Sequence, residues 1–349
     1  MVFIKKMKNN LLITGANGFI GSHIVRAFCK PLRAEVTALV RPSADLRFIR
    51  RYPIEIMHGD LNEGSFDLAQ MQTFDTIVHA GGKVGDWGDY QDFYRTNVLG
   101  SLALFDATRA NSGFIYISSN AVLGEEDETQ AKAENAERRP VLEYAFENLL
   151  PSAMNHYRLS KAVAEILLIA RAKQTGRRLT VIRPVWVFGP REFNAGPYEY
   201  CKTVKSGMPM MPGCNSNRFH TIYAGDLAKI VVKVSEHIKD GINIYNAGNP
   251  KVELMTDYWS AFCAAMGVKV PRHIPKWLLY PPAMLMEAAC SLAGATEPPL
   301  FTRARVYMFY ASNVYNVSKV IDDYGIDKFT SLEKATRVTV RWWRMNGYL

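Results

Sequence analysis

The stretch LLITGANGFIG at residues 11–21 predicts the fold class of the chain. Its apolar start predicts a buried strand, and the glycines that follow predict a tight turn into a helix. Gly15 permits the turn, Gly18 lets the backbone approach a pyrophosphate, and Gly21 lets the helix pack closely on the strand. The first N–H groups of such a helix bind phosphates. We therefore expect a dinucleotide-binding unit here rather than a purely structural turn.

The same alternation of strands and helices continues through the first two-thirds of the chain. Apolar runs predict strands at residues 10–14, 35–40, 54–58, 76–79, 113–118 and 179–183. Amphipathic stretches predict helices at residues 20–29, 94–111, 157–174 and 332–345. We expect an α/β fold with a doubly wound parallel Rossmann sheet in residues 1–184. Residues 185–349 are expected to form mainly a smaller α+β substrate-binding region, with some elements returning to the Rossmann domain.

The bulk composition is that of an ordinary globular protein. The 349 residues carry a formal net charge of +9, but the basic residues are scattered, so nucleic-acid binding is not expected. The densest basic cluster, Lys5, Lys6 and Lys8, is typical of a solvated tail. The five cysteines contain no CxxC pair, and no histidine pair has metal-ligand spacing. We therefore expect reduced thiols, no metal site and a cytoplasmic location.

The residues after the second predicted strand bear on the choice of cofactor. At this position an acidic residue binds the ribose 2′-hydroxyl of NAD, whereas an arginine accommodates the 2′-phosphate of NADP. The sequence has Arg41, followed by Ser43, and therefore favours NADP(H). NAD(H) remains the alternative, because Arg41 could be an exposed loop residue and Asp45 could act as the acid.

Three further residues form a candidate catalytic set. Tyr157 and Lys161 are four residues apart in YRLSK and would share one face of a helix. A nearby ammonium lowers the pKa of a phenol and suits it to acid/base work. The strand at residues 113–118 leads into Ser119, whose hydroxyl could hydrogen-bond a substrate oxygen. Each feature alone is equally consistent with a surface pair or a cap at a strand end.

Together and in this order, the motifs resemble the extended short-chain dehydrogenases/reductases of the NAD-dependent epimerase/dehydratase superfamily. The resemblance covers nearly the whole chain and includes HGDLNE at residues 58–63. It implies that Tyr157 is the general acid/base and that Lys161 lowers the pKa of Tyr157 and binds the nicotinamide ribose. It also implies that Ser119, rather than the neighbouring serine, stabilises the substrate oxygen, and that Asn97 supports a proton-relay water.

The resemblance further implies which residues surround the cofactor. Asp60 and Leu61 would lie near the adenine, and Pro184 and Val187 would flank the nicotinamide. The implied cofactor residues are Thr14, Gly15, Asn17, Gly18, Phe19, Ile20, Gly21, Arg41, Ser43, Asp60, Leu61, His79, Ala80, Gly81, Tyr157, Lys161, Pro184 and Val187. The sequence has glycines at 81 and 82 where many family members have alanines, which leaves the packing against the cofactor open.

The C-terminal third resembles the 3β-hydroxysteroid dehydrogenase-like branch of this superfamily. That branch implies interconversion of a secondary alcohol and a ketone on a bulky apolar substrate, sterol-like or otherwise lipophilic. Within residues 274–296, the apolar run WLLYPPAMLMEAACSLAGAT is interrupted by two prolines and by Glu287. This run is too broken to span a membrane. It predicts a buried helix, the wall of a substrate pocket, or a peripheral membrane contact.

Two other functions fit the same motifs. A nucleotide-sugar epimerase or dehydratase with tightly bound NAD shares the Tyr–Lys pair, and Arg183, Arg191 and Arg218 would then contact the sugar nucleotide. A non-catalytic cofactor-binding protein would leave the Ser–Tyr–Lys set without a purpose. The resemblance also implies a homodimer formed through the helix that carries Tyr157, although the apolar run at residues 162–170 suits a core face equally well.

Overall fold

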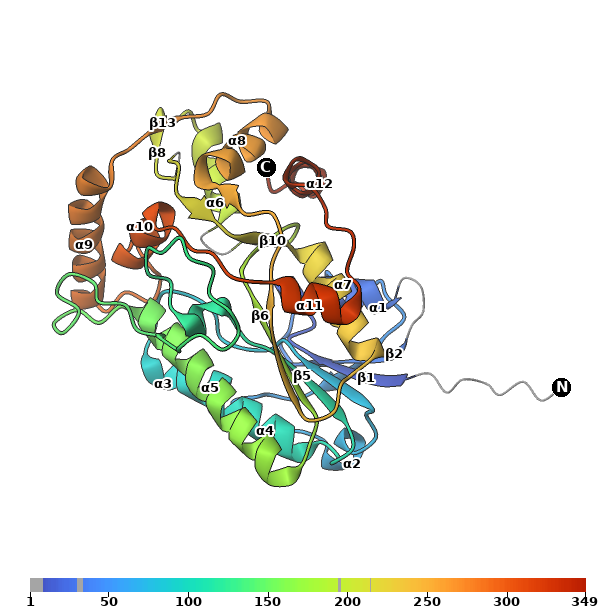
Figure 1. Cartoon of the computed structure of the whole chain (residues 1–349). Coiled ribbons are helices and arrows are strands. Elements are labelled where there is room, and N and C mark those ends of the chain that lie inside the picture. Colours follow the sequence, from blue (N-terminus) through green and yellow to red (C-terminus); the bar gives the residue numbers. More distant parts are fainter. Residues whose placement is uncertain (1–8, 30–33, 194–195, 214) are drawn as a thin grey trace.

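A seven-stranded parallel sheet forms the centre of the structure (Figure 1). The computed structural model describes residues 9–29, 34–193, 196–213 and 215–349, so the cluster of Lys5, Lys6 and Lys8 and the thiol of Cys214 lie outside it. The strands are β1 (Asn9–Thr14), β2 (Ala34–Val40), β3 (Glu55–His58), β4 (Thr76–His79), β5 (Gly113–Ile117), β6 (Leu179–Pro184) and β11 (Ile242–Ala247). Their order is β11-β6-β5-β4-β1-β2-β3, with every pairing parallel. The predicted α/β fold with a parallel Rossmann sheet is confirmed.

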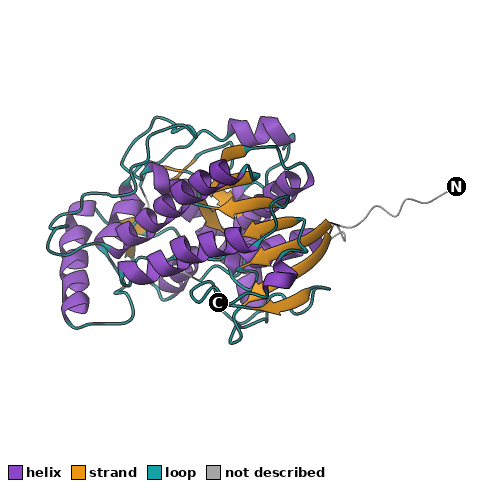
Figure 2. Ribbon diagram, turned by 90° about the horizontal axis from the view of Figure 1, so that it is seen from below, coloured by secondary structure: helices purple, strands orange, loops and turns teal. Residues whose placement is uncertain are grey.

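Successive side chains of each strand pack on opposite faces of the sheet, and helices cover both faces (Figure 2). In β1, Leu11 and Ile13 pack on one face and Leu12 packs on the other. A strand that is buried on both sides is apolar throughout, which is why these runs are recognisable in the sequence. The first face is covered by α1 (Phe19–Cys29), α7 (Ala224–Glu236) and α11 (Ser318–Tyr324), and the second by α2 (Leu68–Met71), α4 (Gly100–Ala107) and α5 (Ala153–Thr175).

The strand order reverses at β1, which pairs with β2 on one side and β4 on the other. Thr14 at the end of β1 is level with Leu39 and His79 on these neighbours. The connections from β1 and β4 lead to helices on opposite faces of the sheet, and this arrangement opens a crevice beyond the carboxyl ends of the strands. The glycine turn lies at this crevice and leads directly into α1.

The C-terminal region forms a second core, rich in aromatic side chains, beside the sheet. Trp259, Phe262 and Trp343 are buried in this core. Its elements and the neighbouring segments are β7 (Trp186–Phe188), α6 (Pro197–Lys205), β8 (Met210–Met211), β9 (Arg218–Phe219), β10 (Thr221–Tyr223), β12 (Glu253–Leu254), α8 (Met255–Met266), β13 (Arg272–His273), α9 (Lys276–Leu292), α10 (Arg303–Tyr310) and α12 (Leu332–Met345). From the same part of the sequence, β11 joins the large sheet and α7 packs against α1.

The helix predicted at residues 94–111 differs from the observed one in its limits and its geometry. The helical segment begins earlier, with α3 (Tyr90–Phe93), because the side chain of Asp89 accepts a hydrogen bond from the backbone N–H of Gln91. It continues as a π-helix, η1 (Tyr94–Leu99), and then as α4, which ends at Ala107. The π-helical turn contains Asn97, and such turns are frequent at functional sites.

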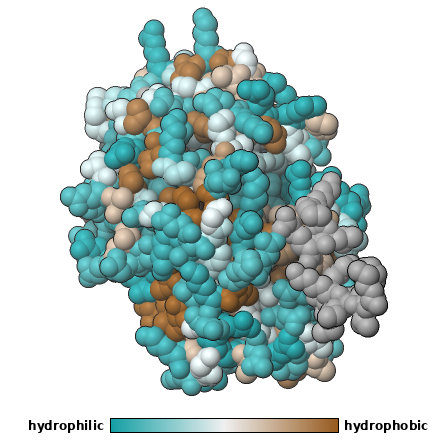
Figure 3. All heavy atoms as spheres, turned by 45° about the vertical axis from the view of Figure 1, so that its right-hand side comes forward, coloured by the Kyte–Doolittle hydropathy of each residue, from teal (hydrophilic) through white to brown (hydrophobic). Residues whose placement is uncertain are grey.

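The apolar run near residue 280 forms one continuous helix, α9, with Pro281 and Pro282 inside it. Only Leu279, Ala283 and Glu287 of this helix are buried, so the interpretation as a buried helix is wrong. No helix in the described part of the chain is long and apolar enough to cross a membrane. The face of the molecule seen in Figure 3 is mainly hydrophilic, with hydrophobic residues in small scattered groups.

Candidate active site

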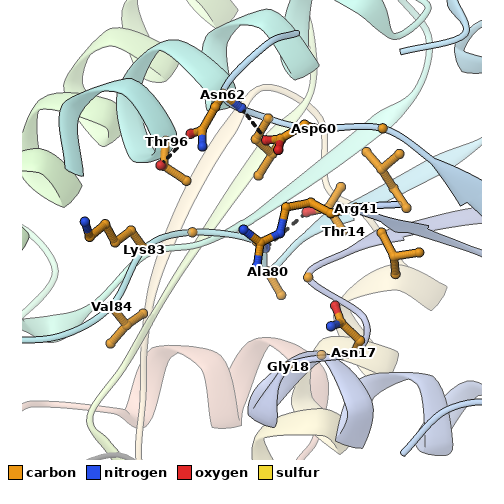
Figure 4. Close-up of a pocket in the computed structure, with 18 of the residues that line it drawn as sticks. Thr14, Asn17, Gly18, Arg41, Asp60, Asn62, Ala80, Lys83, Val84 and Thr96 are labelled. Atoms are coloured by element: carbon orange, nitrogen blue, oxygen red, sulfur yellow. Dashed lines mark hydrogen bonds between the residues drawn. The ribbon is translucent and has the colours of Figure 1, made fainter. Parts of the chain in front are cut away.

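A cavity of about 720 Å³ lies beyond the carboxyl ends of β1, β2 and β4 (Figure 4). Of the predicted cofactor residues, those that line it are Thr14, Gly15, Asn17, Gly18, Phe19, Ile20, Gly21, Arg41, Asp60, Leu61, Ala80 and Gly81. Sequence reasoning missed several polar lining residues. Among them, Asn62 donates its backbone N–H to Asp60 Oδ1 at 2.8 Å and accepts from Thr96 Oγ1 at 2.6 Å. These two bonds tie the loop after β3 to η1 across one wall of the cavity.

The glycine turn has the geometry that a bound pyrophosphate needs. Gly15 has a φ of +63°, and a Cβ atom there would lie 2.7 Å from Gly81 Cα. A Cβ atom on Gly21 would lie 2.7 Å from the carbonyl carbon of Gly15, so only glycine lets α1 begin this close to the turn. Gly18 is exposed in the cavity, and a Cβ atom added there would meet only Gly15 O, at 3.2 Å. The backbone is thus open to a ligand at Gly18, and the turn fits a dinucleotide.

The unusual glycines after β4 are explained by their neighbours. A Cβ atom at Gly81 would lie 2.9 Å from Leu61 Cδ1, and a Cβ atom at Gly82 would lie 2.9 Å from Asn97 Oδ1. Leu61 and Asn97 therefore occupy the space that alanine side chains would need. The departure from the family pattern is compensated locally, and the cavity wall is closely packed.

His79 supports the cavity from behind rather than lining it, contrary to the implied cofactor contact. Its Nδ1 lies 2.6 Å from Thr14 Oγ1 and its Nε2 lies 2.8 Å from Ser101 Oγ. Thr14 Oγ1 in turn accepts the Gly81 N–H at 3.1 Å. Burial, with a smaller effect of the Lys161 charge, lowers the pKa of His79 to about 3, so the ring is neutral. His79 thereby fixes the hydroxyl that holds the loops after β1 and β4 together.

Asn97 joins the cavity wall to the helix that carries Tyr157. Its Oδ1 accepts from the Lys83 N–H at 2.8 Å, and its Nδ2 donates to Lys83 O at 3.0 Å and to Ser160 Oγ at 2.9 Å. Both amide hydrogens are used in these bonds. The structure therefore gives Asn97 a positioning role, while its role with a relay water stays a prediction.

Arg41 and Ser43 follow β2, as expected, but only Arg41 lines the cavity. Figure 4 shows the Arg41 side chain extending from the end of its strand over the cavity. Asp45, the alternative acid, is exposed and pairs with Arg47, which holds the pKa of the Asp45 carboxyl below its usual value. Ser43 is exposed and lies outside the cavity lining.

Ser119 and Tyr157 are brought together by β5 and α5. β5 ends at Ile117, and Ser119 caps the following 3-10 helix, η2 (Asn120–Leu123), by accepting the Ala121 N–H at 3.2 Å. Because that bond uses a lone pair, the Ser119 O–H is left to donate, and it lies close enough to the Tyr157 phenol to act on its pKa. Burial raises the pKa of Tyr157 to about 12, although the Ser119 hydroxyl acts to lower it.

Lys161 does not lower the pKa of Tyr157 in this structure, which corrects the expectation from their spacing. Its Nζ donates to Ile117 O at 2.8 Å and lies 4.3 Å from the centre of the Tyr116 ring. Burial lowers the pKa of Lys161 itself to about 7, with Glu165 acting in the opposite direction. The Lys161 amine is therefore held at the end of β5, at Ile117, two residues before Ser119. At neutral pH only part of the Lys161 side chains carry a proton and a positive charge.

Glu165 is a positioning residue that sequence reasoning missed. Its fully buried carboxylate accepts from Ser118 Oγ at 2.9 Å, from Arg183 Nε at 3.0 Å and from Arg138 Nη2 at 2.5 Å. Burial acts to raise the pKa of Glu165, but the two guanidinium groups outweigh burial and lower it. One carboxylate thus links α5, the ends of β5 and β6, and the loop that contains Arg138. Its position four residues after the lysine, in a run that is otherwise apolar, was the available signal.

The remaining predicted residues lie away from the cavity. Pro184 is buried at the end of β6, and Val187 is half-buried in β7. Neither lines the cavity, so their contact with a nicotinamide stays a prediction. Arg191 is buried, hydrogen-bonds Tyr52 and lies 5.6 Å from the centre of the Phe48 ring.

Arg183, Arg191 and Arg218, which a sugar nucleotide was expected to contact, lie at three different places in the fold. Arg183 is buried against Glu165, Arg191 packs under the loop after β2, and Arg218 is exposed in β9. Within the described residues, no group of three or more His, Cys, Asp or Glu side chains could hold a metal ion.

Several characterised proteins are similar to this chain over most of their length. It is 25% identical to a putative dihydroflavonol 4-reductase of Synechocystis sp., over 98% of this chain and 97% of that protein. It is 24% identical to a 2-alkyl-3-oxoalkanoate reductase of Shewanella oneidensis, over 94% and 85% respectively. It is also 25% identical to an N-acetyl-alpha-D-glucosaminyl-diphospho-ditrans,octacis-undecaprenol 4-epimerase of Escherichia coli, over 90% and 89%.

Solved structures share the fold. That of gox2253 has a TM-score of 0.77 and 23% identity, and the match covers 98% of this chain and 99% of that one. That of dTDP-glucose 4,6-dehydratase from Bacillus anthracis in complex with NAD has a TM-score of 0.73 and 17% identity, and the match covers 97% of both chains.

A family model settles the assignment that the glycine turn, the strand order and the Ser–Tyr–Lys positions indicate. The model of the NAD dependent epimerase/dehydratase family matches residues 11–248, which is more than half of the chain. The proteins that resemble this chain include ones named as a reductase, a dehydratase and an epimerase. The protein belongs to the NAD dependent epimerase/dehydratase family and is an enzyme of the extended short-chain dehydrogenase/reductase type.

Proposed function

We propose that this protein is an NAD(P)-dependent reductase or dehydrogenase that interconverts a ketone and a secondary alcohol on a bulky lipophilic substrate. The observation that carries the proposal is that β5 and α5 bring the Ser119 hydroxyl beside the Tyr157 phenol, close enough to act on the pKa of the phenol. Two adjacent hydroxyl groups can bind one carbonyl oxygen, and one of them can supply its proton. In this proposal Ser119 holds the substrate oxygen and Tyr157 is the general acid/base.

The protonation state of Tyr157 fits the reductive direction. With its pKa raised to about 12 by burial, the phenol carries its proton at neutral pH and can donate it to a carbonyl oxygen. The Ser119 hydroxyl then stabilises the phenolate that remains, because a hydrogen bond to the charged form favours it. When bound, the nicotinamide supplies the two electrons of the reaction.

For the cofactor we propose NADP(H) ahead of NAD(H). The exposed backbone at Gly18 and the first turn of α1 would hold the pyrophosphate. Arg41 lines the cavity and would contact a 2′-phosphate, and Asp45, the alternative acid, is paired with Arg47. Asp60 and Leu61 would lie beside the adenine, as the cavity lining allows.

Two observations support a lipophilic substrate. They are the names of similar proteins, and the separation of Arg183, Arg191 and Arg218, which do not gather at one site. Two proteins of similar length are named as reductases, one of a 2-alkyl-3-oxoalkanoate and one of dihydroflavonol. Arg183, which could have bound a sugar nucleotide, instead forms a buried ion pair with Glu165. We therefore favour a lipophilic ketone or alcohol over a nucleotide sugar.

A Tyr157→Phe variant tests the mechanism. We expect it to bind NADPH as the wild type does, and to lose turnover with a panel of lipophilic ketones, because only the proton donor is removed. Tyr94→Phe is a matched control, since Tyr94 is a half-buried tyrosine on the neighbouring η1 and should keep full turnover. Normal turnover in Tyr157→Phe would refute the proposed acid.

Nucleotide-sugar epimerisation or dehydration is the second candidate. The epimerase of Escherichia coli named above is as similar in sequence as the reductases are. An enzyme of that kind keeps its NAD throughout the cycle. Purified protein that retains NAD through dialysis and fails to exchange it for added NADPH would favour this candidate.

We also propose that the protein forms a homodimer through α5. The side chains of Ile166 and Leu167 on this helix and of Leu99 on η1 are exposed. α5 and η1 pack against each other, so these apolar residues lie on adjoining elements. An Ile166→Glu variant should be monomeric by size-exclusion chromatography with light scattering, and a wild-type protein that is itself monomeric would refute the dimer.

A further inference from the structure

The exposed residues of α9 are mostly apolar from its first turn to its last, with Lys276 and Ser291 as the polar exceptions. Its exposed apolar residues are Trp277, Leu278, Pro281, Pro282, Leu285, Met286, Ala289 and Leu292. Three of them are very open to solvent, with exposed fractions of 75% for Trp277, 65% for Leu285 and 90% for Leu292. The outer side of a surface helix normally carries polar residues, so this pattern indicates that another apolar surface covers α9.

A buried ion pair fixes the orientation of α9. On its inner side, Glu287 Oε2 accepts from Arg303 Nε at 3.0 Å and from the Arg303 backbone N–H at 2.8 Å. Arg303 is completely buried and also donates to the carbonyl oxygens of Ala145 and Leu150. Turning α9 over would break a buried pair and leave both charges without partners, which is strongly unfavourable. The apolar side therefore faces outward in the stable fold.

The loop tied to Arg303 extends the apolar surface. Phe146 and Leu149 lie between the two carbonyl groups that Arg303 binds, and both are exposed, Leu149 by 84%. Tyr280 of α9 accepts a hydrogen bond from the backbone N–H of Ala145, so the loop and the helix are in contact. Figure 1 shows this loop beside α9 at the edge of the molecule. We call the exposed apolar residues of α9, together with Phe146 and Leu149, the α9 patch.

Basic residues lie next to the start of α9. Lys269 and Arg272 are exposed in the segment that leads into the helix, and Lys276, also exposed, is the first residue of the helix. Trp277 follows them directly, and tryptophan beside lysine and arginine is typical of segments at the surface of a bilayer. One exposed acidic residue, Glu297, follows the other end of the helix. The charge beside the patch is thus positive on the side of Trp277.

We propose that the α9 patch docks the protein on the surface of a membrane that contains anionic lipids. Trp277, Leu285 and Leu292 would insert at the level of the boundary between headgroups and acyl chains. Lys269 and Arg272 would contact the anionic headgroups. Pro281 and Pro282 leave two carbonyl groups of the first helical turns without backbone donors, and headgroup water can satisfy these groups. The docking does not depend on the proposed reaction.

The size of the patch favours a membrane over a second copy of the chain. A helix of 17 residues is about 25 Å long and offers an outer side about 10 Å wide. That is roughly 250 Å², whereas a stable protein interface buries about 800 Å² on each partner. A bilayer needs no matching surface, because each inserted side chain contributes separately.

Vesicle co-sedimentation tests the proposal with the full chain. Wild-type protein should sediment with phosphatidylcholine vesicles that contain phosphatidylglycerol, and more weakly with phosphatidylcholine alone. A Leu285→Glu/Leu292→Glu variant should bind at least about tenfold more weakly, because two inserted apolar groups are lost. Leu68→Glu is the matched control: Leu68 is 63% exposed on α2, outside the patch, and should bind as the wild type does.

Two further measurements separate the contribution of the basic residues to membrane binding from that of Trp277. Replacing Lys269, Arg272 and Lys276 with glutamine should weaken binding to phosphatidylglycerol vesicles by about fivefold for each charge removed. The tryptophan emission of the wild type should shift to the blue on binding, and Trp277→Phe should lose most of that shift.

Three outcomes would overturn the proposal. The first is no sedimentation of the wild type with either kind of vesicle. The second is unchanged sedimentation of the Leu285→Glu/Leu292→Glu variant. The third is conversion of an oligomer to a monomer by that variant without any vesicle binding by the wild type, which would assign the α9 patch to contact between copies. Turnover of a water-soluble ketone should be the same in all patch variants, so failure of docking is distinguishable from failure of the proposed reaction.

Discussion

Replacing Gly21 by alanine tests one of two roles of the glycine turn, the close packing of α1 on the turn. Replacing Gly18 by alanine tests the other, the approach of a ligand to the backbone. The Cβ atom added at Gly21 would lie 2.7 Å from the carbonyl carbon of Gly15 and 2.9 Å from Ala16 Cα. Ordinary carbon–carbon contacts are about 3.5 Å or longer, and the Gly15 carbonyl oxygen lies closer still, so the start of α1 must move by at least about 0.8 Å. Both neighbours are backbone atoms and cannot rotate away, unlike a flexible side chain.

The cost can be estimated from overpacking. Forcing a methyl group into a closely packed site costs about 3 kcal/mol at the upper end of the usual range. Alanine recovers about 1 kcal/mol of helix propensity relative to glycine, which leaves a net loss of about 2 kcal/mol. With an entropy of unfolding of about 2.1 cal/mol/K per residue, a chain of 349 residues should lose about 3 °C in Tm.

Gly18→Ala is the matched control, measured by the same thermal unfolding and by fluorescence titration with NADPH. Its Cβ atom meets only Gly15 O, at 3.2 Å, so its Tm should change little. Because Gly18 is exposed in the cavity, the methyl group should instead weaken NADPH binding at least about tenfold, or by about 1.4 kcal/mol. Equal losses of Tm in the two variants, or unchanged NADPH affinity in Gly18→Ala, would refute the roles assigned here.

Three other variants probe charges near the site. Glu165→Gln leaves Arg183 buried without a counter-charge and should lower the free energy of unfolding, measured with urea, by about 3–5 kcal/mol. Because folding lowers the pKa of Glu165, the greater stability of the wild type should be lost as the pH falls below about 4.3, the pKa of glutamate in the unfolded chain. Lys161→Met should change with pH in the same direction but in a higher pH range: burial lowers the pKa of Lys161 to about 7, so the cost of the buried charge to the wild type is greatest below pH 7 and vanishes as the pH rises toward the unfolded pKa. The Tm of Lys161→Met relative to wild type should therefore be higher at pH 6 than at pH 9, and a difference that does not vary with pH would contradict the pKa shift. Arg41→Glu should reverse a preference for NADPH over NADH in paired Kd measurements, and an unchanged ratio of the two Kd values would remove Arg41 from cofactor selection.

The parts of the fold that the sequence predicts are those with strong local signals. Apolar runs bounded by turns placed β4 at the observed residues, and the other predicted strands within one residue at each end. β11 was not predicted, although INIYNA shows the alternation of apolar and polar residues that is typical of a strand at the edge of a sheet. For α9, one of the three interpretations that the sequence left open, the buried helix, is wrong. Its apolar composition predicts burial, and only the three-dimensional packing shows which side is covered.

The candidate site divides in the same way. Residues that act through backbone geometry, such as Gly15 and Gly18, carry their role in the residue type itself. The role of a residue that acts through partners far away in the sequence cannot be recognised from its residue type. Glu165 meets arginines that are 18 and 27 positions away in the sequence, and His79 meets Thr14 across 65 positions. Without a tertiary structure there is no means of pairing these groups.

The Tyr157–Lys161 pair shows most clearly what spacing alone leaves undetermined. Four-residue spacing on a helix predicts that an ammonium lowers the pKa of a phenol. In the structure, burial dominates both groups and acts on them in opposite directions, since it disfavours the charged form of each. The pKa of the phenol rises to about 12 and that of the amine falls to about 7, so above neutral pH both groups are mainly uncharged. Such a tyrosine carries its proton at neutral pH, which is the protonation state that a reduction of a carbonyl group would start from. The burial that contradicts the simple Tyr–Lys rule is therefore compatible with the reductive direction that we propose.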